Sequence, residues 1–203
     1  MITQRFNPNP EWKDPNIPTN KSFAGIFSVA YRAGEILHQT FPGEEIRMIE
    51  IGSYMGESTQ VFASSQGFNH IIAIDPLDGY EEFSEMFNYD WKTVEKEFKI
   101  NTRYFDNITL LKDYSYNVAD TIEDNSQHMV YIYGDHSYAG VKRDIELFLP
   151  KIKEGGIISG HDFIAGHAGV MDAVFEFFDR DLEIFDDESW WHIIKPKNNG
   201  NFI

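Results

Sequence analysis

Short apolar runs alternate with longer stretches in which apolar residues recur at helical spacing. This alternation is typical of βαβ units, in which parallel strands form a sheet and the connecting helices cover it. The runs that predict strands are Arg47–Ser53, His70–Pro76, Ile108–Asp113, Met129–Tyr133 and Gly156–Gly160. The stretches that predict helices are Phe23–Thr40, Ser58–Gln66, Asp90–Arg103, Tyr116–Glu123, Gly140–Lys153 and Gly169–Arg180.

Two further apolar runs follow, Leu182–Phe185 and Trp190–Pro196, and only the residues 186–189 separate them. So short a link allows a hairpin but not the crossover that parallel strands need. The final strand should therefore enter the sheet antiparallel. The pattern predicts an α/β fold: a Rossmann-like, doubly wound sheet of seven strands, mostly parallel with an antiparallel last strand. Residues 23–203 are expected to form this single domain, after an extended arm over the proline-rich residues 1–22.

Composition narrows the class of protein. The chain has 203 residues, enough for one domain with a substantial core, and no cysteine, which excludes disulfides and thiolate metal sites. Its formal net charge of −16 argues against broad binding to nucleic acid or anionic lipid. No apolar run is long enough to span a bilayer, and the first residues lack a signal-peptide pattern. A cytoplasmic protein is therefore expected, and its oligomeric state stays open.

Polar residues and glycines follow every predicted parallel strand. In doubly wound sheets, ligands bind beyond the carboxyl ends of the strands, near the point where the strand order reverses. The repeated occurrence of such residues along one edge indicates a ligand site there. The residues at these ends are Glu50, Gly52 and Ser53, then Asp75, then Asp113 and Ser115, then Gly134, Asp135 and His136, and finally Gly160, His161 and Asp162.

The loop after the first strand, IEIGSYMGEST, is the most informative about the ligand. Gly52 and Gly56 let the backbone turn sharply and approach a ligand closely. The loop lacks the G-x-G-x-x-G pattern of dinucleotide sites, and Glu50 would repel a pyrophosphate but suits a cationic ligand. Asp75 is spaced to accept hydrogen bonds from ribose hydroxyls. S-adenosylmethionine, an adenosine with a positively charged tail, fits these residues better than NAD does.

Four segments carry a family resemblance: IEIGSYMGEST, IIAIDP, YGDHSYAGVKRDIELFLPKIKEGGIISGHDF and WWHIIKP. Over residues 46–196 the chain resembles class I S-adenosylmethionine-dependent methyltransferases. It is most similar to the branch that includes macrocin-type sugar O-methyltransferases, and catechol O-methyltransferase is a more distant relative. The resemblance implies an O-methyltransferase that acts on a small hydroxylated molecule, with a sugar or other polyhydroxylated metabolite as the expected acceptor.

The resemblance also assigns roles at the cofactor site. It places the glycine loop around the methionine portion of the cofactor, with Glu50 supporting the loop, and it places Asp75 at the ribose. Ser58 either caps the following helix or contacts the cofactor carboxylate. Ser115, beside the adenine, is likewise a cofactor contact or a helix cap. The expected cofactor residues are Glu50, Gly52, Ser53, Tyr54, Gly56, Ser58, Asp75, Asp113, Ser115 and Asp135, with Pro76 and Leu77 as an apolar wall for the base.

His136 matches the general base of this branch. A hydroxyl is a poor nucleophile until it loses its proton, and an imidazole with a pKa near neutral suits that task. Tyr133 departs from the branch, whose members have a metal-binding Asp here, because a neutral phenol is a poor ligand for magnesium. His161 and Asp162 remain as expected ligands of a divalent metal, and this pair suits manganese, zinc or iron better. Without a metal, the two residues would orient the acceptor.

Two other functions are compatible with the sequence. The loss of the Asp at position 133 also fits a protein that binds S-adenosylmethionine without transferring its methyl group. A nucleotide-dependent oxidoreductase is the weaker alternative, because the G-x-G-x-x-G pattern is missing.

Overall fold

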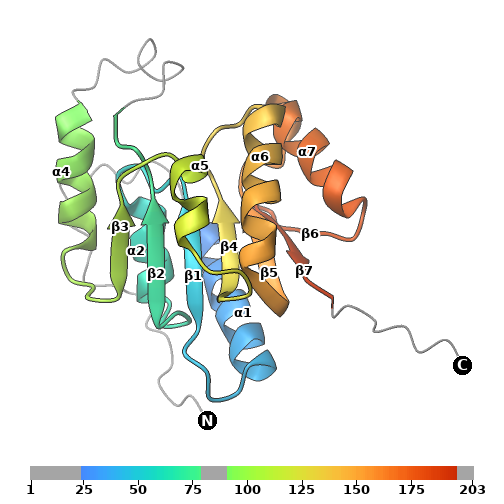
Figure 1. The fold of residues 1–203 in the computed structure, drawn as a ribbon, viewed down its shortest axis with the longest axis horizontal. Helices are drawn as coiled ribbons and strands as arrows, with labels where there is room; N and C mark the ends of the chain where they lie inside the picture. Colours follow the sequence, from blue (N-terminus) through green and yellow to red (C-terminus); the bar gives the residue numbers. More distant parts are fainter. Residues whose placement is uncertain (1–23, 79–90, 196–203) are drawn as a thin grey trace, which may run out of the picture.

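The computed structural model describes residues 24–78 and 91–195, and seven strands in them form one sheet (Figure 1). The strands are β1 (Arg47–Ile51), β2 (His70–Ile74), β3 (Ile108–Leu111), β4 (Gln127–Ile132), β5 (Ile152–Gly160), β6 (Glu183–Ile184) and β7 (Trp190–Ile193). Their order across the sheet is β3-β2-β1-β4-β5-β7-β6. The first five are parallel, and β7 pairs antiparallel with both β5 and β6. The predicted fold class is confirmed, whereas the arm predicted over residues 1–22 lies outside the described residues.

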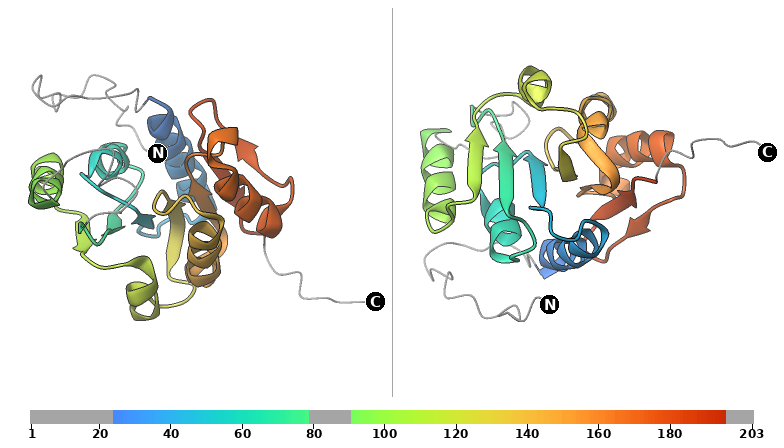
Figure 2. Two further views of the ribbon diagram at one scale, coloured as in Figure 1. Left: turned by 90° about the horizontal axis from the view of Figure 1, so that it is seen from above. Right: turned by 60° about the horizontal axis from the view of Figure 1, so that its bottom comes forward.

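Helices cover both faces of the sheet (Figures 1 and 2). On one face lie α1 (Ala24–Thr40) and α2 (Glu57–Ser64), and on the other lie α5 (Ser115–Val118), α6 (Tyr138–Phe148) and α7 (Ala168–Phe178). The helix α4 (Trp91–Thr102) packs against α2 beside the edge strand β3. Within residues 24–78 and 91–195, no helix is long and apolar enough to cross a membrane.

The central strands are buried on both faces. Along β1, Met48 packs into the cluster beneath α1 and α2, and Ile49 packs into the cluster beneath α6 and α7. Every residue of β4 is buried. Strands covered on both faces read as continuous apolar runs rather than as an alternating pattern, which is why the sequence reveals them clearly. Glu50, which follows Ile49, therefore points to the α2 face and has no exposed surface.

The structure corrects the predicted boundary between α6 and β5. The helix ends at Phe148 rather than Lys153, and the strand begins at Ile152 rather than Gly156. Pro150 has no N–H to continue the helical hydrogen bonds, and a 3-10 turn over Leu149–Lys151 takes the place of the last helical turn. The register of β5 against β4 shifts in its first half, so part of the strand lacked the regular pattern that the prediction relied on.

The helix predicted over Tyr116–Glu123 is also shorter than expected. The helix α5 ends at Val118 and continues as a 3-10 turn over Ala119–Thr121. The Thr121 hydroxyl donates to the Val118 carbonyl at 2.6 Å. Such side-chain bonds to the backbone compete with helical bonding and favour an early end.

Parallel pairing brings the carboxyl ends of β1, β2, β4 and β5 to one edge of the sheet. At this edge Gly52 has a φ of +84°, and a Cβ on it would lie 2.2 Å from the carbonyl oxygen of Tyr133. The Gly52 N–H donates to the Ile74 carbonyl at 2.8 Å, and the Tyr133 N–H donates to the Ile51 carbonyl at 2.8 Å. The three strand ends are therefore fixed together at a point that only glycine can occupy.

Alanine substitutions at Gly52 and Gly43 should separate crowding from backbone strain. Gly43 has the same φ, +84°, but nothing lies within 4 Å of the position of its Cβ. Gly43→Ala should therefore cost only the left-handed strain, about 1–2 kcal/mol of unfolding free energy. Gly52→Ala should cost about 1–3 kcal/mol more, because the new methyl group overpacks the strand ends. Urea denaturation of both variants measures the difference, and equal losses would contradict the close packing at Gly52.

Candidate active site

The loop between β1 and α2 has an unusual backbone. Gly52 and Gly56 have φ of +84° and +76°, and Tyr54 between them has φ of +44°. The Gly56 N–H donates to the Ser53 carbonyl at 2.7 Å, and Gly56 is the N-cap residue of α2. Of the two alternatives for Ser58, the helix cap is therefore excluded, and the contact with the cofactor carboxylate remains a prediction. Ser58 is the second residue of α2 and is buried.

Asp75, after β2, joins this loop to the one that follows β2. Its Oδ2 accepts a hydrogen bond from the Tyr54 N–H and its Oδ1 accepts one from the Leu77 N–H, both at 2.8 Å. Burial raises the pKa of Asp75, and the two backbone hydrogen bonds oppose that rise. The residue predicted to bind ribose thus lies next to the glycine loop and also holds that loop in place.

A cavity of about 190 Å³ opens at the carboxyl ends of β1, β2 and β4. Its lining residues are Ile51, Gly52, Ile74, Pro76, Tyr114, Ser115, Tyr116, Asp135, Arg143 and Asp144. Three predicted cofactor residues, Gly52, Ser115 and Asp135, are thus brought together, and Pro76 supplies the expected apolar wall. Tyr114 and Tyr116, which the sequence analysis missed, flank Ser115, and their rings stack at 5.2 Å.

Asp144 was not predicted as a site residue, although it lines this cavity. It is buried in α6 and accepts a hydrogen bond from the Ser115 hydroxyl at 2.6 Å. Burial raises its pKa to about 6, and the Ser115 bond and the Arg143 charge only partly oppose this. Ser115 is therefore no helix cap, since Tyr114 takes that position. A signal for Asp144 was present, because it occupies the apolar stripe of α6 between Val141 and Phe148.

Other predicted cofactor residues lie around the cavity and not in its wall. Asp113 is exposed, and its Oδ1 accepts hydrogen bonds from the Tyr114 N–H and from Asn117 Nδ2, both at 2.7 Å. Ser53 is buried, and its hydroxyl has no hydrogen-bond partner among the described residues. Asp113 thus shapes the start of α5, while Ser53 lies buried within the loop.

Glu50 is fully buried against the start of α2. Its Oε2 accepts a hydrogen bond from the Thr59 hydroxyl, and its Oε1 has no hydrogen-bond partner within the described part of the chain. Burial raises the pKa of Glu50 to about 7; the hydroxyls of Ser58 and Thr59 oppose this rise, and the charge of Asp75 adds to it. The carboxylate ties β1 to α2 beneath the loop, as expected for a residue that supports it.

The loop after β4 places His136 beside Asp162. His136 Nε2 lies 2.7 Å from Asp162 Oδ2, and His161 Nδ1 lies 3.0 Å from Asp162 Oδ1. Burial acts to raise the pKa of Asp162, but the contacts with the two histidines outweigh it and hold this pKa well below its usual range. The carboxylate therefore stays ionised between two imidazoles. A second cavity of about 10 Å³ adjoins His136, and Asp135 lines both this cavity and the larger one.

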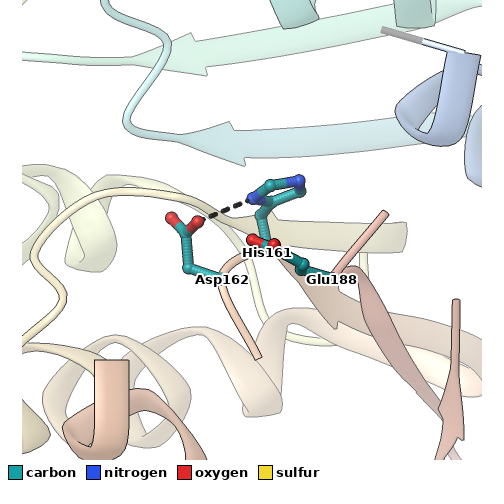
Figure 3. Close-up of side chains that lie close together, drawn as sticks. All are labelled: His161, Asp162 and Glu188. Atoms are coloured by element: carbon teal, nitrogen blue, oxygen red, sulfur yellow. Dashed lines mark hydrogen bonds and ion pairs between the residues drawn. The ribbon is translucent and has the colours of Figure 1, made fainter. Parts of the chain in front are cut away.

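Three potential metal ligands converge next to His136 (Figure 3). His161 and Asp162 follow β5, and Glu188 comes from the link between β6 and β7. One ligand atom of each residue lies within 4.8 Å of the others. One imidazole and two carboxylates are a donor set that fits a divalent ion. The sequence analysis missed Glu188, because nothing in the acidic run Asp186–Glu188 distinguishes a ligand from a surface residue.

The segment from β1 through the loop after β5 matches a known family. A family model described as "Methyltransferase domain" covers residues 49–163, more than half of the chain. The chain belongs to this methyltransferase family. Its sheet order and its glycine loop are those of a class I S-adenosylmethionine-dependent methyltransferase, and the predicted family is confirmed. The more specific macrocin-type branch remains a prediction.

Two solved methyltransferases share this fold. The O-methyltransferase NovP is 17% identical, with a TM-score of 0.62 over 84% of this methyltransferase and 79% of NovP. TomG, an O-methyltransferase from Streptomyces achromogenes involved in tomaymycin synthesis and solved in complex with SAM, is 11% identical. Its TM-score is 0.53 over 83% of this chain and 89% of TomG.

Two sequence relatives are longer than the methyltransferase. A protein of Acanthamoeba polyphaga mimivirus is 30% identical over 148 residues, and one of Sinorhizobium fredii is 27% identical over 120 residues. These matches take in 70% and 57% of this chain. The chain spans 62% of the length of the mimivirus protein and 13% of the length of the Sinorhizobium protein.

The burial of Glu50 should make stability depend on pH. The folded-state pKa of about 7 exceeds the ordinary 4.5, so between these values the folded chain binds the proton more tightly than the unfolded chain. Stability from this group is thus greatest below pH 4.5 and falls as the pH rises through about 7. We expect Glu50→Gln to reduce the loss of unfolding free energy between about pH 5 and pH 8 by about 1–3 kcal/mol.

Denaturation at both pH values checks this expectation. Glu154→Gln, a change at an exposed glutamate, is the matched control and should leave the pH dependence of the natural chain unaltered. The expectation is contradicted if the Glu50→Gln variant loses as much unfolding free energy with rising pH as the natural chain does. The ionisation of Glu50 would then not destabilise the folded chain.

Proposed function

We propose that the methyltransferase moves the methyl group of S-adenosylmethionine to a hydroxyl oxygen of a small polyhydroxylated molecule, such as a sugar, with His136 as the general base. The observation that carries this proposal is the placement of His136. It lies 2.7 Å from an ionised carboxylate, and its neighbour in the chain, Asp135, lines the larger cavity at the glycine loop. An acceptor at His136 would therefore lie next to the reactive end of a cofactor bound over the loop.

The cofactor would extend from the cavity across the loops at the carboxyl ends of the strands. The adenine would enter the cavity between Pro76 and Tyr116, the ribose would meet Asp75, and the methionine portion would lie along Gly52–Gly56. The cavity, at about 190 Å³, is smaller than the roughly 300–1,000 Å³ of sites that enclose a whole ligand. That size suits a site which takes one end of the cofactor while the remainder lies over the loops. Burial raises the pKa of Glu50, behind the loop, to about 7, and a cationic sulfonium and ammonium bound over the loop would favour its ionised form.

The reaction is an in-line displacement at the methyl carbon. The acceptor oxygen forms a bond to the methyl carbon as the sulfur–methyl bond breaks, and S-adenosylhomocysteine leaves. His136 takes the hydroxyl proton, and the Asp162 carboxylate stabilises the imidazolium that results. NovP and TomG are both named O-methyltransferases, which supports oxygen as the atom that receives the methyl group. His161 and Asp162 would hold a divalent ion, which would bind and polarise neighbouring hydroxyls of the acceptor.

A protein that binds the cofactor without catalysis is the second candidate. The observation that favours it is Tyr133, directly after β4, where the branch that the sequence resembles has a metal-binding Asp. Transfer of radiolabelled methyl groups to a panel of sugars and polyols separates the two candidates. Binding of S-adenosylhomocysteine without any methyl transfer would favour the second.

The ribose contact can be tested apart from the structural role of Asp75. Asp75→Asn keeps one oxygen acceptor and replaces the other by an amide NH₂, which cannot accept a hydrogen bond. Both the hydrogen bonds to the loop and the contact with the ribose should therefore weaken. We expect S-adenosylhomocysteine to bind the variant about 5–150-fold more weakly, the equivalent of one or two lost hydrogen bonds. The analogue of S-adenosylhomocysteine that lacks the ribose 3′-hydroxyl should bind the natural chain more weakly than S-adenosylhomocysteine does. The Asp75→Asn substitution should reduce the affinity for this analogue little further. Calorimetry that finds the two losses fully additive would show that Asp75 does not touch the ribose.

His136→Ala should reduce turnover about 10²–10⁴-fold, the usual contribution of a general base, and should leave S-adenosylhomocysteine affinity nearly unchanged. Turnover and affinity are measured on the same preparation, with an acceptor taken from the panel. His70→Ala is the control, because His70 lies at the opposite, amino end of β2, where its Nε2 is 2.9 Å from the Thr109 hydroxyl. If the turnover of His136→Ala stays within a few-fold of that of the natural chain, a group other than His136 removes the hydroxyl proton.

A further inference from the structure

We propose that Glu188 is the third ligand of a divalent metal site with His161 and Asp162, and that it supplies the carboxylate that Tyr133, directly after β4, does not. The third ligand would thus come from the link between β6 and β7 and not from the end of β4. This arrangement deepens the proposed function, because a metal here would contact the acceptor beside His136, but metal binding does not depend on catalysis. Figure 3 shows the three side chains converging from the end of β5 and the β6–β7 link.

The segments that carry the ligands are fixed to each other. The Phe163 N–H, next to Asp162, donates to the Glu188 carbonyl at 2.9 Å. Ser189 is fully buried, and its hydroxyl lies 3.3 Å from the Tyr131 hydroxyl of β4. Asp187 accepts hydrogen bonds from the Ser189 N–H at 3.2 Å and from the Ser189 hydroxyl at 3.0 Å. The backbone of Glu188 is thus held between two hydrogen-bonded neighbours, Asp187 and Ser189.

Charge at this place favours a cation. Asp162, Asp187 and Glu188 are all half-buried, and within residues 24–78 and 91–195 none of them forms an ion pair with a lysine or an arginine. Histidine provides the ion pairs recorded for them: Asp162 meets His136 and His161, and Asp187 lies 4.0 Å from His161 Nε2. The two histidines already stabilise the Asp162 carboxylate, but the Glu188 carboxylate has no ion pair in the described part of the chain. A half-buried carboxylate of this kind is costly unless something else compensates it, and coordinated metals commonly do so.

The ring of Tyr133 packs against His161 on one side of the three potential ligands. Its ring centroid lies 4.7 Å from that of His161. A phenol is neutral at ordinary pH and is a poor ligand for a hard divalent ion. A neutral ring against His161 leaves the carboxylates of Asp162 and Glu188 as the anionic donors on the remaining side.

The donor set predicts which ion binds. Magnesium prefers six oxygen ligands in a strict octahedron, and an imidazole among the ligands disfavours it. Manganese, iron and zinc accept imidazole with carboxylates. One imidazole and two carboxylates also leave coordination positions open to hydroxyl groups of an acceptor.

Metal titration of the tag-free full chain, after treatment with a chelator, tests the proposal. Calorimetry with Mn²⁺, and the loss of the free Mn²⁺ signal in electron paramagnetic resonance, should show one ion per chain, and Mg²⁺ should bind at least about tenfold more weakly. Glu188→Gln should weaken Mn²⁺ binding at least about tenfold, the scale on which metal sites respond to altered ligation. Asp186→Asn, at the exposed acid two residues away, should bind Mn²⁺ as the natural chain does.

A second variant guards against misfolding. Glu188 has a φ of +73°, so Glu188→Gly removes the ligand and also relieves the backbone. This variant should melt no lower than the natural chain and should still lose Mn²⁺ affinity. The proposal is overturned if the natural chain binds no Mn²⁺, or if both Glu188 variants bind Mn²⁺ as tightly as it does. Neither result involves an acceptor, so either one would leave the methyl-transfer proposal standing.

Discussion

The rim of the sheet depends on the two hydrogen bonds that the Asp75 carboxylate accepts. Its donors are the backbone N–H groups of Tyr54 and Leu77, and both residues adopt left-handed conformations, with φ of +44° and +52°. Such conformations are unfavourable for side-chain-bearing residues and persist only where the surroundings enforce them. A carboxylate that binds both amides supplies that enforcement, since charge-assisted hydrogen bonds are the stronger kind. The loops after β1 and β2 are therefore shaped before any cofactor binds.

Around this fixed point, the edge of the sheet divides into two regions. On the β2 side, the cavity with its stacked tyrosines and the buried Ser115–Asp144 pair suits a flat heterocycle. On the β5 side lie His136 and the potential metal ligands around Asp162, where we propose that the acceptor binds. Asp135 borders both regions, and Gly140 leaves room for its carboxylate, since a Cβ there would lie 2.3 Å from it. The methyl group would cross from one region to the other over the end of β4.

The sequence predicts those parts of the molecule that one segment determines by itself. The two-sided burial of the central strands gives continuous apolar runs, and the short link after Phe185 requires a hairpin, so the sheet follows directly. Gly52 and Asp75 stand out because each is needed at its own strand end. Glu188 and the Ser115–Asp144 pair escape prediction, because their roles arise only when distant segments meet. The helix-cap alternative for Ser58 fails for a related reason: a glycine in a left-handed conformation takes the cap position that a serine usually fills.

The central claim is that this edge of the sheet binds S-adenosylmethionine and not a dinucleotide. Calorimetric titration of the natural chain with S-adenosylhomocysteine and, separately, with NAD tests it most directly. One molecule of S-adenosylhomocysteine should bind per chain, and NAD should give no heat of binding, because the loop lacks the glycines that admit a pyrophosphate and carries Glu50 behind it. Binding of NAD, or the absence of binding by S-adenosylhomocysteine, would contradict the account.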